Sequence, residues 1–224
     1  MTANPNVRPN KLGVITRGSL SQGIDMKLDD DLSVEAIAAG SFVVIQGEAY
    51  DFFAMITDAS IEAANEGILL HPPAADDALL RDVMRGVSTY ATVALKPMLM
   101  MPNTGHQDLQ AEPARSVKTI PAHFSPVARA TADDVARIFG HEANDGGNTY
   151  FHMGEPLGME GIPVCINLKR FVERSNAVFG KTGTGKTFLT RLLLCGTIKN
   201  DRAVNLIFDM HSEYGYSATI ENDG

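Results

Sequence analysis

Short apolar segments follow one another at regular intervals through the first hundred residues. Most are about five residues long, rich in β-branched and aromatic residues, and separated by Gly, Asp and Ser. They cover residues 12–16, 23–28, 41–45, 52–56 and 90–99. Regularly spaced short strands predict a small barrel or sandwich, and we place a β-barrel at residues 11–100. A polar stretch with two prolines precedes it, so we expect residues 1–10 to form a disordered tail.

Two other stretches have the spacing of helices. Residues 75–85 place several apolar side chains on one helical face. Thr131 is suited to an N-cap and two aspartates follow it, which predicts a helix over residues 132–139 ending at Gly140.

The region between the barrel and the C-terminal part is rich in proline. Residues 101–128 carry four prolines and few aliphatic residues, which is typical of a linker or an extended crossover. We therefore assign residues 101–159 to a connector that contains one short helix at 131–140.

The C-terminal part has the pattern of a βαβ unit. Residues 176–179 and 203–208 are apolar enough for buried parallel strands, and residues 186–199 between them predict a helix with a broad apolar face. The unit takes about 30 residues, the usual length. Residues 162–168 predict a further strand that leads into it.

A complete phosphate-binding loop, G-x-x-x-x-G-K-[ST], lies between the first strand and the helix of this unit. The nucleotide-binding residues that we assign are Gly180, Lys181, Thr182, Gly183, Thr184, Gly185, Lys186, Thr187 and Phe188. Backbone amides and the helix N-terminus bind phosphates in such loops, Lys186 reaches the β- and γ-phosphates, and the Thr187 hydroxyl is a Mg²⁺ ligand. A chance glycine-rich turn would lack the strand–helix–strand context. We expect ATP and Mg²⁺ as cofactors.

A second polar cluster follows the last predicted strand. Asp209 ends this strand, at the edge of a parallel sheet that faces the ligand, and Glu213 follows four residues later. Both carboxylates can order Mg²⁺ or its waters, or polarise an attacking water. The spacing fits equally well with a helix-capping Asp and a solvated Glu in a loop.

The negative charge of the chain is unevenly distributed. The net charge of −8 lies in residues 1–150, whereas residues 151–224 are balanced. An acidic surface binds nucleic acid poorly, so DNA would contact a local basic surface or something outside this chain.

The two cysteines, Cys165 and Cys195, have no ligand spacing and are predicted to be reduced, buried hydrophobes. Without a signal core or a membrane-length apolar run, a cytoplasmic location is expected.

The chain as a whole resembles the HerA-like ATPases, relatives of the FtsK motors in the RecA-like P-loop class. The resemblance rests on the barrel-like segments, on the turn at residues 153–156 with its following strand, and on the D-x-H-x-E-Y pattern after the P-loop helix. That pattern is Asp209, His211, Glu213 and Tyr214, and Arg174 matches an arginine that precedes the P-loop strand in the family.

The resemblance implies an α+β two-domain chain, with the barrel followed by the start of a RecA-like α/β domain at residues 160–224. It implies a DNA translocase or helicase that works in a ring, usually a hexamer, with a nuclease or a defence effector. Lys186, Asp209 and Glu213 would be catalytic, Thr187 and Asp209 would hold the metal, and Arg174 would be a nucleotide or subunit sensor rather than a surface arginine.

One departure from the family weakens the expectation of activity. Only 37 residues follow Thr187, and no later apolar run ends in Asp-Glu. The resemblance implies further strands, a Walker B pair, pore loops and an arginine from a neighbouring subunit. We therefore expect a truncated motor domain with weak or no turnover by itself. The alternative is a non-catalytic chain whose barrel serves oligomerisation or partner docking; a P-loop kinase is less favoured, because it needs strands that are missing too.

Overall fold

The computed structural model describes residues 8, 10–64, 70, 77, 79, 83, 84, 89–103, 114–142 and 149–214. Most of the predicted tail at 1–10 and of the predicted helix at 75–85 lies outside these residues. The chain divides into two compact units, which are described separately: residues 1–132 with 156–160, and residues 133–155 with 161–224. In the described part, no helix is long and apolar enough to cross a membrane.

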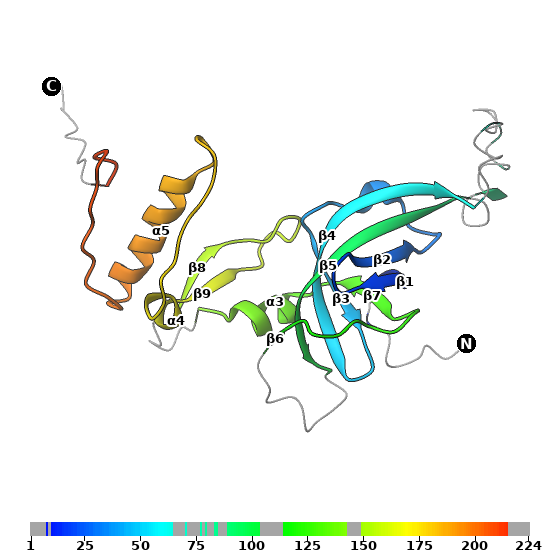
Figure 1. Ribbon diagram of the computed structural model, residues 1–224, viewed down its shortest axis with the longest axis horizontal. Coiled ribbons are helices and arrows are strands. Elements are labelled where there is room, and N and C mark those ends of the chain that lie inside the picture. The colour runs from blue at the N-terminus through cyan, green and yellow to red at the C-terminus, as the bar shows by residue number, and fades with distance from the viewer. Residues whose placement is uncertain are drawn as a thin grey trace. The chain divides into compact units, whose positions relative to one another are not determined.

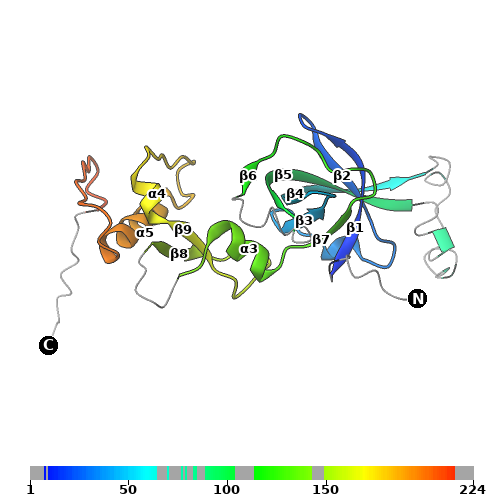
Figure 2. The ribbon, with the colours of Figure 1, turned by 90° about the horizontal axis from the view of Figure 1, so that it is seen from below.

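The first unit is a closed barrel of six antiparallel strands (Figures 1 and 2). Neighbouring strands around the ring follow the order β2-β1-β7-β3-β4-β5, and β2 pairs with β5 to close it. The strands are β1 (Lys11–Ser19), β2 (Gly23–Leu28), β3 (Phe42–Gln46), β4 (Tyr50–Ala63), β5 (Thr89–Pro102) and β7 (Pro126–Arg129). The predicted barrel and its five predicted strands are confirmed.

The sixth strand comes from the proline-rich region that the sequence assigned to a connector. β7 pairs with β1 on one side and β3 on the other, so it fills the gap between them. A short strand, β6 (Arg115–Ser116), pairs with β5 outside the ring. Pro126 begins β7, a position that tolerates the missing N–H of proline. The barrel therefore extends beyond residue 100.

The barrel core follows the two-residue alternation of its strands. In β2 every second residue is buried, namely Ile24, Met26 and Leu28. The fully buried side chains of the neighbouring strands pack with them: Ile15, Val43, Ile45, Ile56, Val93, Leu95 and Val127. Gly13 allows β1 to approach β2 closely, because a Cβ there would lie 2.0 Å from the Lys27 carbonyl oxygen.

Local sequence signals explain two short helices, one in each unit. The 3₁₀ helix η1 (Val34–Ala36) is capped by Ser33, whose hydroxyl accepts a bond from the Glu35 amide. The helix predicted within the connector is confirmed as α3 (Ala132–Phe139). It ends at Gly140, which has a φ of 74° and donates its N–H to the Ala136 carbonyl.

The second unit is built around a hairpin and a long helix. β8 (Tyr150–Gly154) and β9 (Val164–Asn167) are antiparallel, and α4 (Leu168–Val172) and α5 (Lys186–Lys199) follow. The strand predicted at 162–168 is present but ends at Asn167, because the Asn167 side chain caps α4 by accepting the Arg170 amide. The helix predicted at 186–199 is confirmed.

The two parallel strands predicted on either side of α5 are wrong. Residues 176–179 and 203–208 have no strand assignment, and most of their side chains are exposed, with Phe179 at 90% and Phe208 at 88%. A strand is stabilised by hydrogen bonds to its neighbours. In the described part of this unit the only ladder is β8–β9, which pairs with neither segment. Their apolar composition therefore does not lead to a sheet here.

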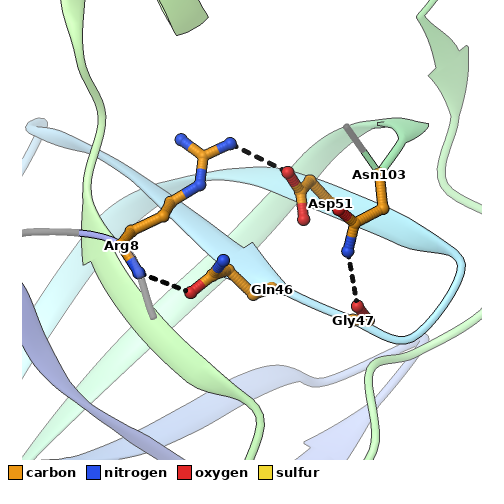
Figure 3. Close-up of polar contacts among 5 residues, drawn as sticks. All are labelled: Arg8, Gln46, Gly47, Asp51 and Asn103. Carbon is orange, nitrogen blue, oxygen red and sulfur yellow. Dashed lines mark hydrogen bonds and ion pairs between the residues drawn. The ribbon is translucent and has the colours of Figure 1, made fainter. Parts of the chain in front are cut away.

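A buried ion pair joins the residues before β1 to one end of the barrel (Figure 3). The Arg8 guanidinium lies 2.8 Å from the Asp51 carboxylate, whose side chain is 1% exposed. The Arg8 amide also donates to the Gln46 side chain at 3.2 Å, and Asn103 donates from its side chain to the Gly47 carbonyl at 3.0 Å. These contacts tie the N-terminal segment, the β3–β4 turn and the end of β5 together.

We predict that Arg8→Ala destabilises the barrel by about 3 kcal/mol, because it removes the cation beside a buried carboxylate. Urea unfolding followed by circular dichroism measures the change. Arg17→Ala is the control, since Arg17 is exposed on β1 and should change stability by less than about 0.5 kcal/mol. Equal effects of the two substitutions would contradict the role given to the ion pair.

Candidate nucleotide-binding site

The P-loop leads directly into the first turn of α5. Gly183 and Gly185 have φ values of 81° and 84°. Residues with a Cβ rarely adopt this left-handed backbone conformation, whereas glycine does so easily. Gly185 occupies the N-cap position of α5, so the free amides of the first helical turn lie next to the loop. These amides and the positive end of the helix dipole suit an anionic ligand.

The loop is closed on itself through the Lys181 carbonyl. The Thr184 hydroxyl and amide donate to this oxygen at 2.7 and 3.3 Å, and the Lys186 ammonium donates to it at 2.7 Å. Gly180 fits closely beneath, because a Cβ there would lie 2.5 Å from the Thr184 hydroxyl. The loop therefore has a defined shape, and its lysine is held over its own backbone.

The structure brings Glu213 to Thr187. The Thr187 hydroxyl donates to the Glu213 carboxylate at 2.8 Å. A hydroxyl has one proton and two lone pairs, so donation to Glu213 leaves the oxygen lone pairs free to bind a cation. A hydroxyl beside a carboxylate is a donor set that fits Mg²⁺, and the lysine and loop amides fit the phosphates that Mg²⁺ accompanies.

Asp209 begins the segment that carries Glu213, residues 209–214, and its carboxylate binds backbone amides of that segment. Its carboxylate accepts the Tyr214 amide at 2.7 Å and the His211 amide at 3.3 Å. These bonds close residues 209–214 into a compact turn. Of the two carboxylates that the sequence singled out, Glu213 is the one whose contact with the P-loop helix the structure records, and Asp209 orders the backbone around it.

Two other predicted residues lie apart from these contacts. Arg174 is exposed just beyond α4, and its backbone carbonyl accepts the Asn176 side chain at 2.7 Å. Among the described residues, no hydrogen bond or ion pair joins its guanidinium to the loop. Phe188 follows Thr187 on α5, and its ring is largely exposed.

Sequence reasoning missed Arg191. It lies four residues after Thr187 on α5 and donates from its guanidinium to the Glu213 carbonyl. Its guanidinium carbon is also 5.9 Å from the centre of the Tyr214 ring, a cation–π distance. The sequence did contain a signal for this position, because residues four apart in a helix lie on the same face.

Other chemistry-bearing groups do not form a competing site. Cys165 is buried, which raises the pKa of its thiol and fits the prediction of a core hydrophobe. Cys195 is free but exposed, so its predicted burial is wrong. Within the described residues, no three His, Cys, Asp or Glu side chains gather as a metal cluster. A cavity of about 280 Å³ in the barrel unit is lined partly by Asp29, Asp30 and Glu35, which repel phosphate.

Comparison with known proteins identifies this part of the chain. Residues 151–223 match the family model of the central domain of helicase HerA. These residues form a HerA-like ATPase domain. No curated protein matches the chain.

The match covers the HerA-like part from β8 through the P-loop and α5 to the segment at 209–214. The barrel precedes it. The resemblance proposed from the sequence is thereby confirmed for the family, and so is the order of a β-barrel followed by the start of the HerA-like domain.

We predict that Gly180→Ala lowers the affinity for ATP at least about tenfold, which corresponds to 1.4 kcal/mol, because the new methyl group collides with Thr184 and deforms the loop. Fluorescence titration with a labelled ATP analogue measures it. Gly18→Ala is the matched control, since its Cβ would meet its nearest neighbour at 3.7 Å, an ordinary contact. Unchanged affinity in Gly180→Ala would show that the loop does not hold the nucleotide in this conformation.

Proposed function

We propose that this HerA-like chain binds ATP with Mg²⁺, that it hydrolyses ATP as a subunit of an assembly rather than by itself, and that hydrolysis drives movement along DNA. The observation that carries the first part is the Thr187–Glu213 hydrogen bond beside a complete P-loop. A triphosphate site needs fixed amides, a mobile cation and a metal ligand in one place. The loop, Lys186 and Thr187 supply these three groups.

Each residue has a distinct task in this proposal. The loop amides bind the phosphate oxygens, and Lys186 exchanges the Lys181 carbonyl for the β- and γ-phosphates. Thr187 offers its lone pairs to the metal while its O–H donates a hydrogen bond to the Glu213 carboxylate. Bound Mg²⁺ would neutralise the charge that develops on the phosphates. Glu213, an exposed carboxylate, accepts hydrogen bonds from metal-bound or attacking water, and Asp209 keeps its segment in shape.

The translocase part of the proposal is supported by the HerA match. Motors of this kind work as rings, and we propose that copies of this chain assemble, with a hexamer as the expected size and with a nuclease or defence effector as a partner. Because residues 1–150 carry the whole negative charge, DNA would contact basic surface outside the barrel or outside this chain.

The barrel favours a second candidate function. It is closed, has its own hydrophobic core and ties its N-terminal segment to one end through Arg8 and Asp51. A unit of this kind can serve oligomerisation or partner docking without catalysis. Absence of ATP turnover in the unaltered protein when it is assembled and bound to DNA would favour this function over the first.

We predict that Lys186→Ala lowers ATP turnover by at least about 100-fold, because the cation that stabilises the transferring phosphoryl group is lost. Phosphate release measures turnover. Lys199→Ala removes an exposed lysine at the other end of the same helix and should leave turnover unchanged. Retained turnover in Lys186→Ala would refute the assignment of the site.

We predict that duplex DNA increases turnover and that the protein displaces the third strand of a DNA triplex when ATP is present. Displacement must stop in Lys186→Ala, because movement without hydrolysis has no energy source. A fluorescently labelled third strand reports the release. If DNA does not change the rate of ATP hydrolysis and the third strand is not displaced, the chain is an ATPase but the translocase part of the proposal is wrong.

A further inference from the structure

Arg191 stands on the same face of α5 as the metal-binding hydroxyl. Thr187 and Arg191 are four residues apart in a helix that runs from Lys186 to Lys199, so they lie one turn from each other. Both side chains contact Glu213: the Thr187 hydroxyl contacts its carboxylate, and the Arg191 guanidinium contacts its carbonyl. One residue is therefore held at both its side chain and its backbone.

The segment that carries Glu213 has no helix or strand of its own. Residues 209–214 are closed by the two bonds to the Asp209 carboxylate, which shape the turn but do not place it on α5. Thr187 and Arg191 supply the contacts to α5. The guanidinium also lies over the Tyr214 ring, so it contacts the residue that follows Glu213 as well.

The bond between Thr187 and Glu213 is weak by itself. Both side chains are at least partly exposed, and a hydrogen bond to an exposed carboxylate competes with water. A flexible glutamate in a loop also loses conformational entropy when it is held. A second anchor on the backbone of the same residue lowers that cost, because the carboxylate then has only its own side-chain torsions to fix.

We propose that Arg191 is a positioning residue that keeps the Glu213 carboxylate on the Thr187 hydroxyl and so prepares this hydroxyl for Mg²⁺. The proposal rests on the proposed function, since it assigns Arg191 to the same nucleotide site. The guanidinium contacts the Glu213 carbonyl and the Tyr214 ring, and the proposal assigns it no direct contact with phosphate or metal. Arg191 therefore affects the binding of Mg²⁺ indirectly, by positioning Glu213.

The experiment measures how far Mg²⁺ tightens the binding of a labelled ATP analogue, as the ratio of dissociation constants in EDTA and in Mg²⁺. Arg191→Ala is expected to lower this ratio about tenfold, the usual size of an outer-shell effect on a metal, without changing the affinity in EDTA. Glu213→Ala should lower it similarly. Arg191→Lys should restore part of the loss, because an ammonium can donate to the carbonyl but lacks the planar stacking surface.

The double variant decides how Arg191 acts. If it works through Glu213, Arg191→Ala lowers the ratio no further in a Glu213→Ala background. Equal losses in both backgrounds would overturn the proposal, as would a fall in the EDTA affinity alone. Lys199→Ala is the matched basic control on the same helix and should leave the ratio unchanged.

A second readout does not depend on nucleotide. Amide hydrogen exchange at His211 and Tyr214, whose amides donate to Asp209, should accelerate in Arg191→Ala, keep the rate of the unaltered protein in Lys199→Ala and recover partly in Arg191→Lys. Unchanged exchange in Arg191→Ala would overturn the positioning role whatever the nucleotide does. If Mg²⁺ does not tighten ATP binding in the unaltered protein, the proposed function is wrong, and the exchange measurement still decides whether Arg191 holds the segment.

Discussion

The position of α5, the helix that follows the P-loop, depends on a close contact between Phe151 of β8 and Gly196 of α5. A Cβ at position 196 would lie 2.7 Å from the Phe151 ring, so only glycine lets the helix approach the hairpin this closely. Leu193, Thr197 and Asn200 are buried on the C-terminal half of the helix, whereas its first residues and the P-loop are largely exposed. The helix is therefore anchored at its C-terminal end, and the end that carries the P-loop is exposed to solvent.

The two units are stabilised in different ways. In the barrel every strand has a neighbour on both sides, and closure by β7 removes the open edges that a sheet of five strands would leave. In the HerA-like unit the site is held by polar contacts from single side chains: Lys186 to the loop carbonyl, Thr187 to Glu213, and Asp209 to its own segment. The barrel is therefore stabilised by its strand pairing, and the P-loop region by individual side-chain hydrogen bonds.

Sequence patterns predicted the elements whose signals are local. The alternation in the barrel strands, the N-cap of α3 and the glycine-rich loop before α5 all act within a few residues. β7 was missed because its place between two distant strands is set by barrel closure, and the strands flanking α5 were predicted wrongly because composition does not supply a pairing partner. The spacing identified both Asp209 and Glu213, yet only the folded turn determines that Glu213 reaches Thr187.

The exposed apolar run at residues 204–208 has a consequence for the behaviour of the chain in solution. It is β-prone and contains no charge, features shared by segments that pair with strands of other molecules. Arg202 and Asp209 lie close to its two ends, and charges in such places oppose intermolecular stacking. The carboxylate that shapes the turn therefore also places a negative charge at one end of the apolar run.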